Sequence, residues 1–176
     1  MTHYYISPIG TIGICIADNA VERLQFVDQL PTSAVDIHCA TDSAARATAL
    51  WLDLYFAGSE PEAPLPPIRL QGTAFQKAVW QLIAEIPYGE TATYGELSSR
   101  LAAKETGKQP HTTTRATSRA RAVGQAAGRN PVWLMIPCHR LLAAGGKLGG
   151  YAGGVRRKAW LVCLESANKS SLPSRR

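Results

Sequence analysis

The chain has 176 residues, enough for one domain or two small ones, and 45% of them are hydrophobic, which suffices for a real core. It shows no basic-then-apolar leader and no long apolar run, which argues against secretion and against a membrane-embedded protein. Its four cysteines form no CxxC pair. We therefore expect reduced thiols and a cytoplasmic protein.

The net charge of +6 is unevenly distributed. Residues 1–70 carry three Arg and no Lys against eight Asp and Glu, a balance of −5. Residues 71–176 carry sixteen Lys and Arg against five Glu, a balance of +11. The second half is predicted to meet a polyanion, with nucleic acid the first candidate and a membrane surface the second. From charge alone, a merely soluble basic domain stays open.

The first half predicts a small sheet and one helix. Residues 4–27 alternate and are rich in β-branched and aromatic side chains, which is typical of two or three short antiparallel strands. Asp42 can cap a helix over residues 44–56. The residues expected on its buried face are Ala47, Leu50 and Leu54. Prolines crowd residues 58–67 and mark a linker.

The second half is predicted to be mostly helical. Thr73 can cap a first helix, and a second runs over residues 94–103. Residues 104–117 are polar and basic and predict a loop before a short helix over 118–127, in the outline of a helix-turn-helix. A closing helix is expected over 155–166. The side chains expected to face inward are Leu97, Leu101, Trp160, Leu161 and Leu164.

The run from Ile136 to Arg140 sets the Cys138 thiol beside an imidazole and a guanidinium. Nearby positive charge lowers the pKa of a cysteine, so we expect a reactive thiol rather than core filling. Glu165, the only carboxylate after Glu105, can complete a Cys-His-Glu relay in which His139 takes the thiol proton. The alternative is a Glu165 salt bridge to His139 or Arg140 that only holds the fold.

Two further groups of residues bear on function. Four arginines crowd the second helix of the helix-turn-helix, where they are either a solvated face with phosphate contacts or a surface that sends one arginine into the base stack. They are Arg115, Arg119, Arg121 and Arg129. Four Cys and His residues of the first half are zinc-type ligands, but their spacing does not favour a metal site. They are His3, Cys15, His38 and Cys39.

Over nearly all of residues 73–166 the sequence resembles the O6-alkylguanine-DNA alkyltransferases, also called methylated-DNA–protein-cysteine methyltransferases. The first half matches weakly, chiefly at Ser7-Pro8-Ile9-Gly10. The resemblance implies an α/β protein with a ribonuclease H-like domain (1–57) and a winged-helix-like DNA-binding and alkyl-acceptor domain (73–166). Composition predicts the Pro-rich linker between them (58–72) and a polar, basic, disordered tail (167–176). The matching runs are 75–80, 86–91, 93–97, 121–124, Asn130-Pro131, 136–140, 149–154 and 158–165.

The resemblance also implies an activity, direct-reversal DNA repair without a cofactor. The alkyl group of O6-alkylguanine, or O4-alkylthymine, in double-stranded DNA would pass to Cys138 once per molecule, after base flipping. Cooperative self-assembly on DNA is left open. The competing functions are a non-enzymatic lesion binder that flags alkylated bases for other repair, and a cysteine hydrolase.

The resemblance assigns roles in the chemistry. His139 and Glu165 would produce the Cys138 thiolate through water, and Tyr94 would turn out the 3′ phosphate and donate to N3 of the base. Asn130 and Arg140 would be structural, with Asn130 bracing the turn that holds the site.

The resemblance also places residues on the DNA and around the base. Arg121 would fill the vacated stack, on a surface shared with Arg119, Ala120, Ala122 and Gly124. The Cys138 carbonyl and the Leu141 amide would read the Watson–Crick edge, under a loop containing Gly149, Tyr151 and Ala152.

The chain departs from the family pattern in three places. Residues 104–117 look like an extra loop inside the helix-turn-helix. Ala17 and Glu22 stand where some members have zinc ligands, so no metal is implied. Trp133 is bulky, and we expect it to narrow the pocket and to slow reaction with benzyl-sized adducts; equal rates for benzylated and methylated guanine would contradict this.

Overall fold

The structure, a computed structural model, describes residues 1–106 and 115–169. The chain divides into two compact units. The first unit comprises Met1–Gln71, Pro131–Met135 and the chain from Ala167 onward, and the second comprises Gly72–Asn130 and Ile136–Ser166. None of the described helices is long and apolar enough to cross a membrane.

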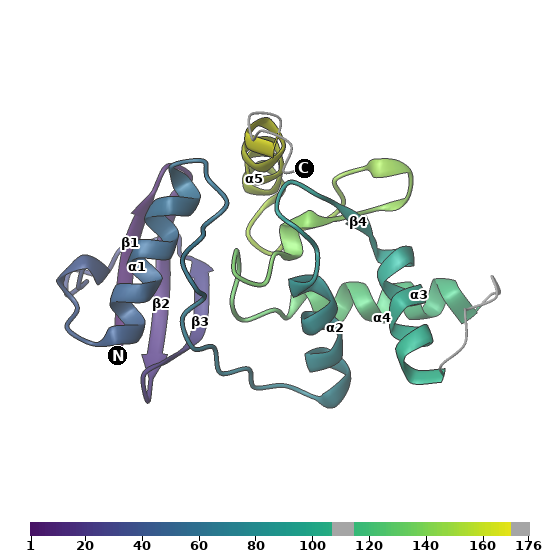
Figure 1. Cartoon of the computed structure of the whole chain (residues 1–176), viewed down its shortest axis with the longest axis horizontal. Coiled ribbons are helices and arrows are strands. Elements are labelled where there is room, and N and C mark those ends of the chain that lie inside the picture. The colour runs from purple at the N-terminus through teal and green to yellow at the C-terminus, as the bar shows by residue number, and fades with distance from the viewer. Residues whose placement is uncertain (107–114, 170–176) are drawn as a thin grey trace. The chain divides into compact units, whose positions relative to one another are not determined.

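The first unit is built on an antiparallel meander of β1 (Thr2–Ser7), β2 (Gly10–Ala17) and β3 (Ala20–Phe26), in that spatial order. Helix α1 (Ser43–Phe56) lies along this sheet (Figure 1). The Asp42 carboxylate accepts a hydrogen bond from the Ala45 amide at 2.8 Å and so caps the helix. The predicted antiparallel strands and helix are confirmed.

The buried face of α1 differs from the predicted one. Leu50 is 53% exposed, whereas Trp51, Leu52 and Tyr55 are buried. The Trp51 and Tyr55 rings stack with their centroids 5.2 Å apart. Because apolar residues occur all round this helix, periodicity alone could not select the face, and the large aromatic rings provide the greater area to bury.

Both edges of the sheet are covered by other segments of the same unit. The Tyr4 amide on β1 donates to the Val35 carbonyl at 2.9 Å. On β3, Val21 forms a bridge with Ile68, and Leu24 forms one with Val132. The Pro131–Met135 segment is thereby tied to this sheet, although it directly precedes the run that carries Cys138.

The second unit contains three helices in contact with one another: α2 (Ala74–Ala84), α3 (Tyr94–Thr106) and α4 (Arg115–Gly128). Thr73 and Gln76 form a capping box at the start of α2, as T-x-x-Q allows. Leu97 and Leu101 are buried as predicted. The Trp80 indole donates to the Ala126 carbonyl at 2.8 Å and so joins α2 to α4.

The helices on either side of the predicted loop over 104–117 are longer than expected, since α3 continues through Thr106 and α4 begins at Arg115. Residues 107–114 lie outside the described residues. Two ion pairs accompany the extra helical turns. Lys104 Nζ lies 2.7 Å from Glu85 Oε1, and Arg119 pairs with Glu105. These contacts between helices could not be read from local propensity.

The remaining elements of the second unit frame a short parallel pair, β4 (Ala92–Thr93) and β5 (Leu141–Leu142). The 3-10 helices η2 (Cys138–Arg140) and η3 (Ala144–Gly146) flank β5, and η1 (Ile37–Cys39) belongs to the first unit.

Helix α5 (Val155–Lys169) follows and extends three residues into the expected tail; residues 170–176 are not described. Its fully buried positions are Lys158, Leu161 and Glu165, while Trp160 and Leu164, predicted inward, are only half-buried.

Candidate active site

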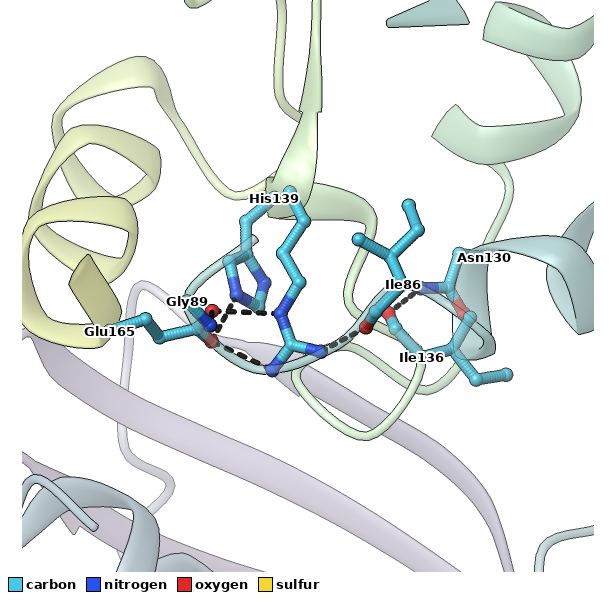
Figure 2. A network of polar contacts seen from close by, with 7 residues as sticks. Ile86, Gly89, Asn130, Ile136, His139 and Glu165 are labelled. Atoms are coloured by element: carbon cyan, nitrogen blue, oxygen red, sulfur yellow. Dashed lines mark hydrogen bonds and ion pairs between the residues drawn. The ribbon is translucent and has the colours of Figure 1, made fainter. Parts of the chain in front are cut away.

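Cys138 begins the η2 turn and is the buried one of the four free cysteines. The Asn130 side-chain amide donates to its Sγ at 3.1 Å and to the Ile136 carbonyl at 2.7 Å. Figure 2 shows the second of these contacts. Asn130 and Ile136 flank the Pro131–Met135 segment in the sequence. The Asn130 side-chain amide therefore joins the two ends of that segment and also contacts the thiol.

His139 and Arg140 both point to Glu165 of α5 (Figure 2). His139 Nε2 lies 2.8 Å from Glu165 Oε1. The Arg140 guanidinium binds both carboxylate oxygens, at 2.7 and 3.0 Å, and donates to the Ile86 carbonyl at 2.6 Å. The Gly89 amide also donates to Glu165 Oε2, at 3.2 Å. Both partners that the sequence offered for Glu165 are therefore used, in one buried network.

The network fixes the protonation of its members. Burial alone would raise the pKa of Glu165, but hydrogen bonds and charges from His139 and Arg140 lower it to about 2. Burial lowers the pKa of His139, and the neighbouring cations Arg140 and Lys158 lower it further against the pull of Glu165. His139 is therefore neutral beside an ionised Glu165. Since a carboxylate only accepts, Nε2 carries the proton and Nδ1 is the basic nitrogen.

The expectation that the pKa of Cys138 is lowered overall is wrong. Burial raises the pKa of this thiol to about 11, although the Asn130 amide and the Lys158 charge act in the opposite direction. The Arg140 guanidinium is directed to Glu165 and Ile86. The thiolate has therefore to be produced during the reaction.

Two tyrosines lie around the thiol. Burial raises the pKa of Tyr94 and of Tyr151, and negative charge on Cys138 would raise both further. Tyr94 begins α3, and its ring passes between two glycines: a Cβ would lie 3.8 Å from the ring at Gly124 and 3.9 Å from it at Gly149. The Tyr151 ring meets the His139 ring edge to face, with centroids 6.5 Å apart. Both phenols keep their protons and can act as donors.

The Cys138 carbonyl and the Leu141 amide, which were expected to recognise the base, form a hydrogen bond with each other. The Leu141 amide donates to the Cys138 carbonyl and closes the η2 turn. Reading a base through this amide would require that bond to be shared or broken. Ala152, expected in the loop over the base, is exposed.

The predicted DNA-binding residues lie on α4. Arg121 is exposed, and Ala120, Ala122 and Gly124 are half-buried. Arg119 is paired with Glu105 of α3, so its charge is partly neutralised. The structure thus separates Arg121 from Arg119, which residue type and charge alone do not.

Trp133 belongs to the first unit, whereas Cys138 belongs to the second. It is 7% exposed, and its ring packs against Phe26 of β3 with the centroids 6.0 Å apart. Its effect on adduct size stays a prediction.

Among the described residues no group of three or more His, Cys, Asp or Glu is placed to hold a metal ion. Of the four zinc-type ligands considered from the sequence, His38 contacts Asp36 and Asp53, and His3 lies 3.6 Å from Asp42. Cys39 is exposed.

Sequence reasoning missed Lys158, which is fully buried on α5. Its ammonium donates to the Leu141 carbonyl at 2.5 Å and to the Gly150 carbonyl at 3.3 Å. The signal was its spacing: Lys158, Leu161 and Glu165 stand at i, i+3 and i+7 and share one helical face. A glutamate judged to be buried there implied that Lys158 is buried too.

The fold and site define a class: a helical unit that carries a buried cysteine beside a neutral histidine and an ionised glutamate. The model of the family "6-O-methylguanine DNA methyltransferase, DNA binding domain" matches residues 74–167. The methylated-DNA–protein-cysteine methyltransferase of Mycobacterium bovis is 36% identical over 170 residues, covering 95% of this chain and 94% of that protein. That of Methanosarcina acetivorans is 35% identical over 168 residues, 92% and 95% of the two chains.

A solved structure, OGT of Mycobacterium tuberculosis in complex with DNA, superposes with a TM-score of 0.75 at 34% identity, covering 95% of this chain and 93% of that one. This chain belongs to the 6-O-methylguanine DNA methyltransferase family. The resemblance seen in the sequence and the predicted order, a sheet with a helix followed by a helical DNA-binding domain, are confirmed.

Proposed function

We propose that Cys138 is the acceptor in this protein's DNA-repair activity, that of a methylated-DNA–protein-cysteine methyltransferase. The donors are O6-alkylguanine and O4-alkylthymine in double-stranded DNA. The observation that carries the proposal is the position of the thiol. Cys138 is the one buried cysteine, and the residue after it is bonded to an ionised glutamate.

Transfer begins with the thiol proton. With a pKa of about 11, roughly one Cys138 thiol in 10,000 is ionised at pH 7. The basic Nδ1 of His139 takes the proton through a water molecule, and Glu165 stabilises the imidazolium that forms. Asn130, whose amide already donates to Sγ, stabilises the thiolate.

The thiolate then displaces the base from the alkyl carbon. The S–C bond forms while the C–O6 bond breaks, and the electron pair of that bond passes to O6 and the purine ring. The Tyr94 hydroxyl donates a hydrogen bond to N3 as this charge develops, and the proton that His139 took from the thiol is available to neutralise the released base. The product is a thioether with no good leaving group, so each protein molecule reacts once.

DNA reaches the site through α4. A relative of known structure was solved in complex with DNA. Arg121 is exposed, whereas Arg119 is held by Glu105, so of these two arginines Arg121 is the one available to fill the stack left by a flipped base. The small residues Ala120, Ala122 and Gly124 allow the helix to approach the duplex closely.

The test is to incubate the protein with a duplex oligonucleotide that contains O6-methylguanine and to locate the added methyl group by peptide mass mapping. One methyl group on Cys138 is expected, with none on the Cys138→Ala variant. The matched control is Cys163→Ala, which removes an exposed thiol of the same unit and should react normally. Binding of the lesion by an unmodified protein would instead support a lesion binder, and turnover of a small ester would support a hydrolase.

A further inference from the structure

Lys158 is a buried cation that the proposed chemistry does not use. It is fully buried on α5, and among the described residues no carboxylate lies within ion-pair distance of its ammonium. Lysines are rarely buried without a paired anion, because removing the charge from water is costly. Other interactions of Lys158 must therefore offset the cost of burying its charge.

Its hydrogen bonds join two segments that frame the site. The Leu141 carbonyl belongs to the strand that follows the Cys138 turn, and the Gly150 carbonyl belongs to the glycine-rich segment that leads into α5. The backbone amide of Lys158 also donates to the Gly154 carbonyl, at 3.1 Å. One residue thus holds the 150–154 segment at both of its ends.

The charge of Lys158 acts on the chemistry as well. Its ammonium stands over the Tyr94 ring, 6.0 Å from the centroid. Burial raises the pKa of Cys138, and the Lys158 charge opposes that rise. Burial lowers the pKa of Lys158, and a thiolate on Cys138 opposes that fall. The same charge helps to keep His139 neutral.

The neighbouring guanidiniums are bound to other groups, Arg140 to Glu165 and Ile86 and Arg157 to the Gly153 carbonyl. The remaining titratable groups around the thiol carry no positive charge before the reaction. Tyr94 comes from α3 and Tyr151 from the glycine-rich segment, and both remain protonated and neutral. His139, on the same turn as Cys138, is neutral before the reaction. A thiolate formed here is therefore stabilised by dipoles, by the imidazolium that forms on His139 and by the Lys158 ammonium; of these two cations, Lys158 is the one already charged before the proton transfer.

We propose that Lys158 is a positioning residue for alkyl transfer, which fixes the Leu141 and Gly150 carbonyls and supplies the buried positive charge that favours ionised Cys138. This rests on the proposed function of Cys138 as the acceptor. Lys158 does not take part in bond making: it sets the shape of the loop beside the thiol and the ease with which the thiol loses its proton.

The test measures Cys138 without DNA. Alkylation by iodoacetamide is followed against pH, with the Cys138 peptide quantified by mass spectrometry. In Lys158→Met we expect the midpoint to move to higher pH and the rate at pH 8 to fall about tenfold, which corresponds to one pKa unit. Arg156→Met removes the same charge from an exposed position of α5 and should leave the profile unchanged.

A second variant keeps the test decisive if Lys158→Met does not fold. Lys158→Gln lacks the charge, but its amide can still donate to a carbonyl; it should show the same pH shift together with faster hydrogen exchange over 149–154. A folded Lys158→Gln with the wild-type midpoint overturns the proposal.

The result is separable from the proposed function. Failure of wild-type protein to take a methyl group from the oligonucleotide refutes Cys138 as acceptor whatever the iodoacetamide profile shows. Normal transfer with an unshifted profile refutes only the role of Lys158.

Discussion

The two units each contain a histidine held by carboxylates, and the two histidines respond in opposite directions. In the first unit, His38 Nδ1 lies 2.9 Å from Asp36, and Nε2 lies 3.2 Å from Asp53. In the second, His139 Nε2 lies 2.8 Å from Glu165. The hydrogen bond to Asp36 raises the pKa of His38, whereas burial lowers the pKa of His139.

The difference comes from the solvent exposure of the imidazole and from the presence of Arg140 beside one of the carboxylates. His38 is half-exposed, so solvation of the imidazolium is retained and two carboxylates favour it. His139 is fully buried, and Arg140 already neutralises its carboxylate. The same pair of side-chain types therefore makes a charged surface contact in one unit and a neutral base in the other.

The largest expected effect tests the buried carboxylate. Glu165→Gln leaves the Arg140 guanidinium buried without its counter-charge, and we expect a loss of 3–5 kcal/mol, on the order found for broken buried pairs, in the free energy of unfolding. Asp53→Asn, which breaks the half-exposed counterpart, should cost about 1 kcal/mol or less. Urea unfolding of both variants measures the contrast. Equal losses would remove the distinction between the two sites.

The acid dependence of the wild-type protein should follow from Glu165. The pKa of Glu165 is lowered from 4.5 to about 2. The contribution of this carboxylate to the free energy of unfolding is therefore fully present above pH 4.5 and is lost as the pH falls toward 2. The shift corresponds to about 3 kcal/mol. Unfolding free energies measured between pH 5 and 2 should show this slope, and Glu165→Gln should flatten it. An unchanged slope in the variant would assign the acid sensitivity to other groups.

The third prediction concerns the neutral base. His139→Gln should slow single-turnover methyl transfer about 100-fold, because the thiol, with its raised pKa, loses the group that takes its proton. His38→Gln is the matched control and should transfer at the wild-type rate. Rates are read from quenched time courses with the O6-methylguanine duplex. A change of less than about threefold in His139→Gln would remove His139 from the relay.

The smallest effect tests the exposed histidine. Because the pKa of His38 is raised, the contribution of its ion pairs to the free energy of unfolding is fully present below pH 6.5. This contribution is lost as the pH rises through the raised pKa. Solvent screens this half-exposed pair, so we expect less than about 1 kcal/mol. Unfolding free energies of the wild type should decline slightly above pH 6.5, and the decline should be absent in His38→Gln. A larger decline that persists in the variant would point to another group.

Much of the fold could be predicted because its signals are local. Alternation predicted the strands, and the Thr73–Gln76 spacing predicted the start of α2. The errors fall where distant contacts decide. The buried face of α1 depends on the stacking of Trp51 on Tyr55, and the length of α3 is accompanied by ion pairs with Glu85 and Arg119. Neither contact leaves a trace in the local pattern.

The candidate site divides in the same way. The order of residues around Cys138 identified the thiol, the histidine and a partner for Glu165. It did not predict that burial would raise the pKa of the thiol, that Arg119 would be paired while Arg121 stays exposed, or that Lys158 would lie inside.

The amino-acid sequence by itself determined the chemistry that is available and the family to which the chain belongs, because residue types and their spacing are linear properties. The tertiary structure alone decided the charge of each group. Burial of the imidazole, and whether its carboxylate partner is already paired with Arg140, set whether a histidine is a cation or a neutral base. Burial also sets whether the Cys138 thiol is ionised at rest or only during the reaction.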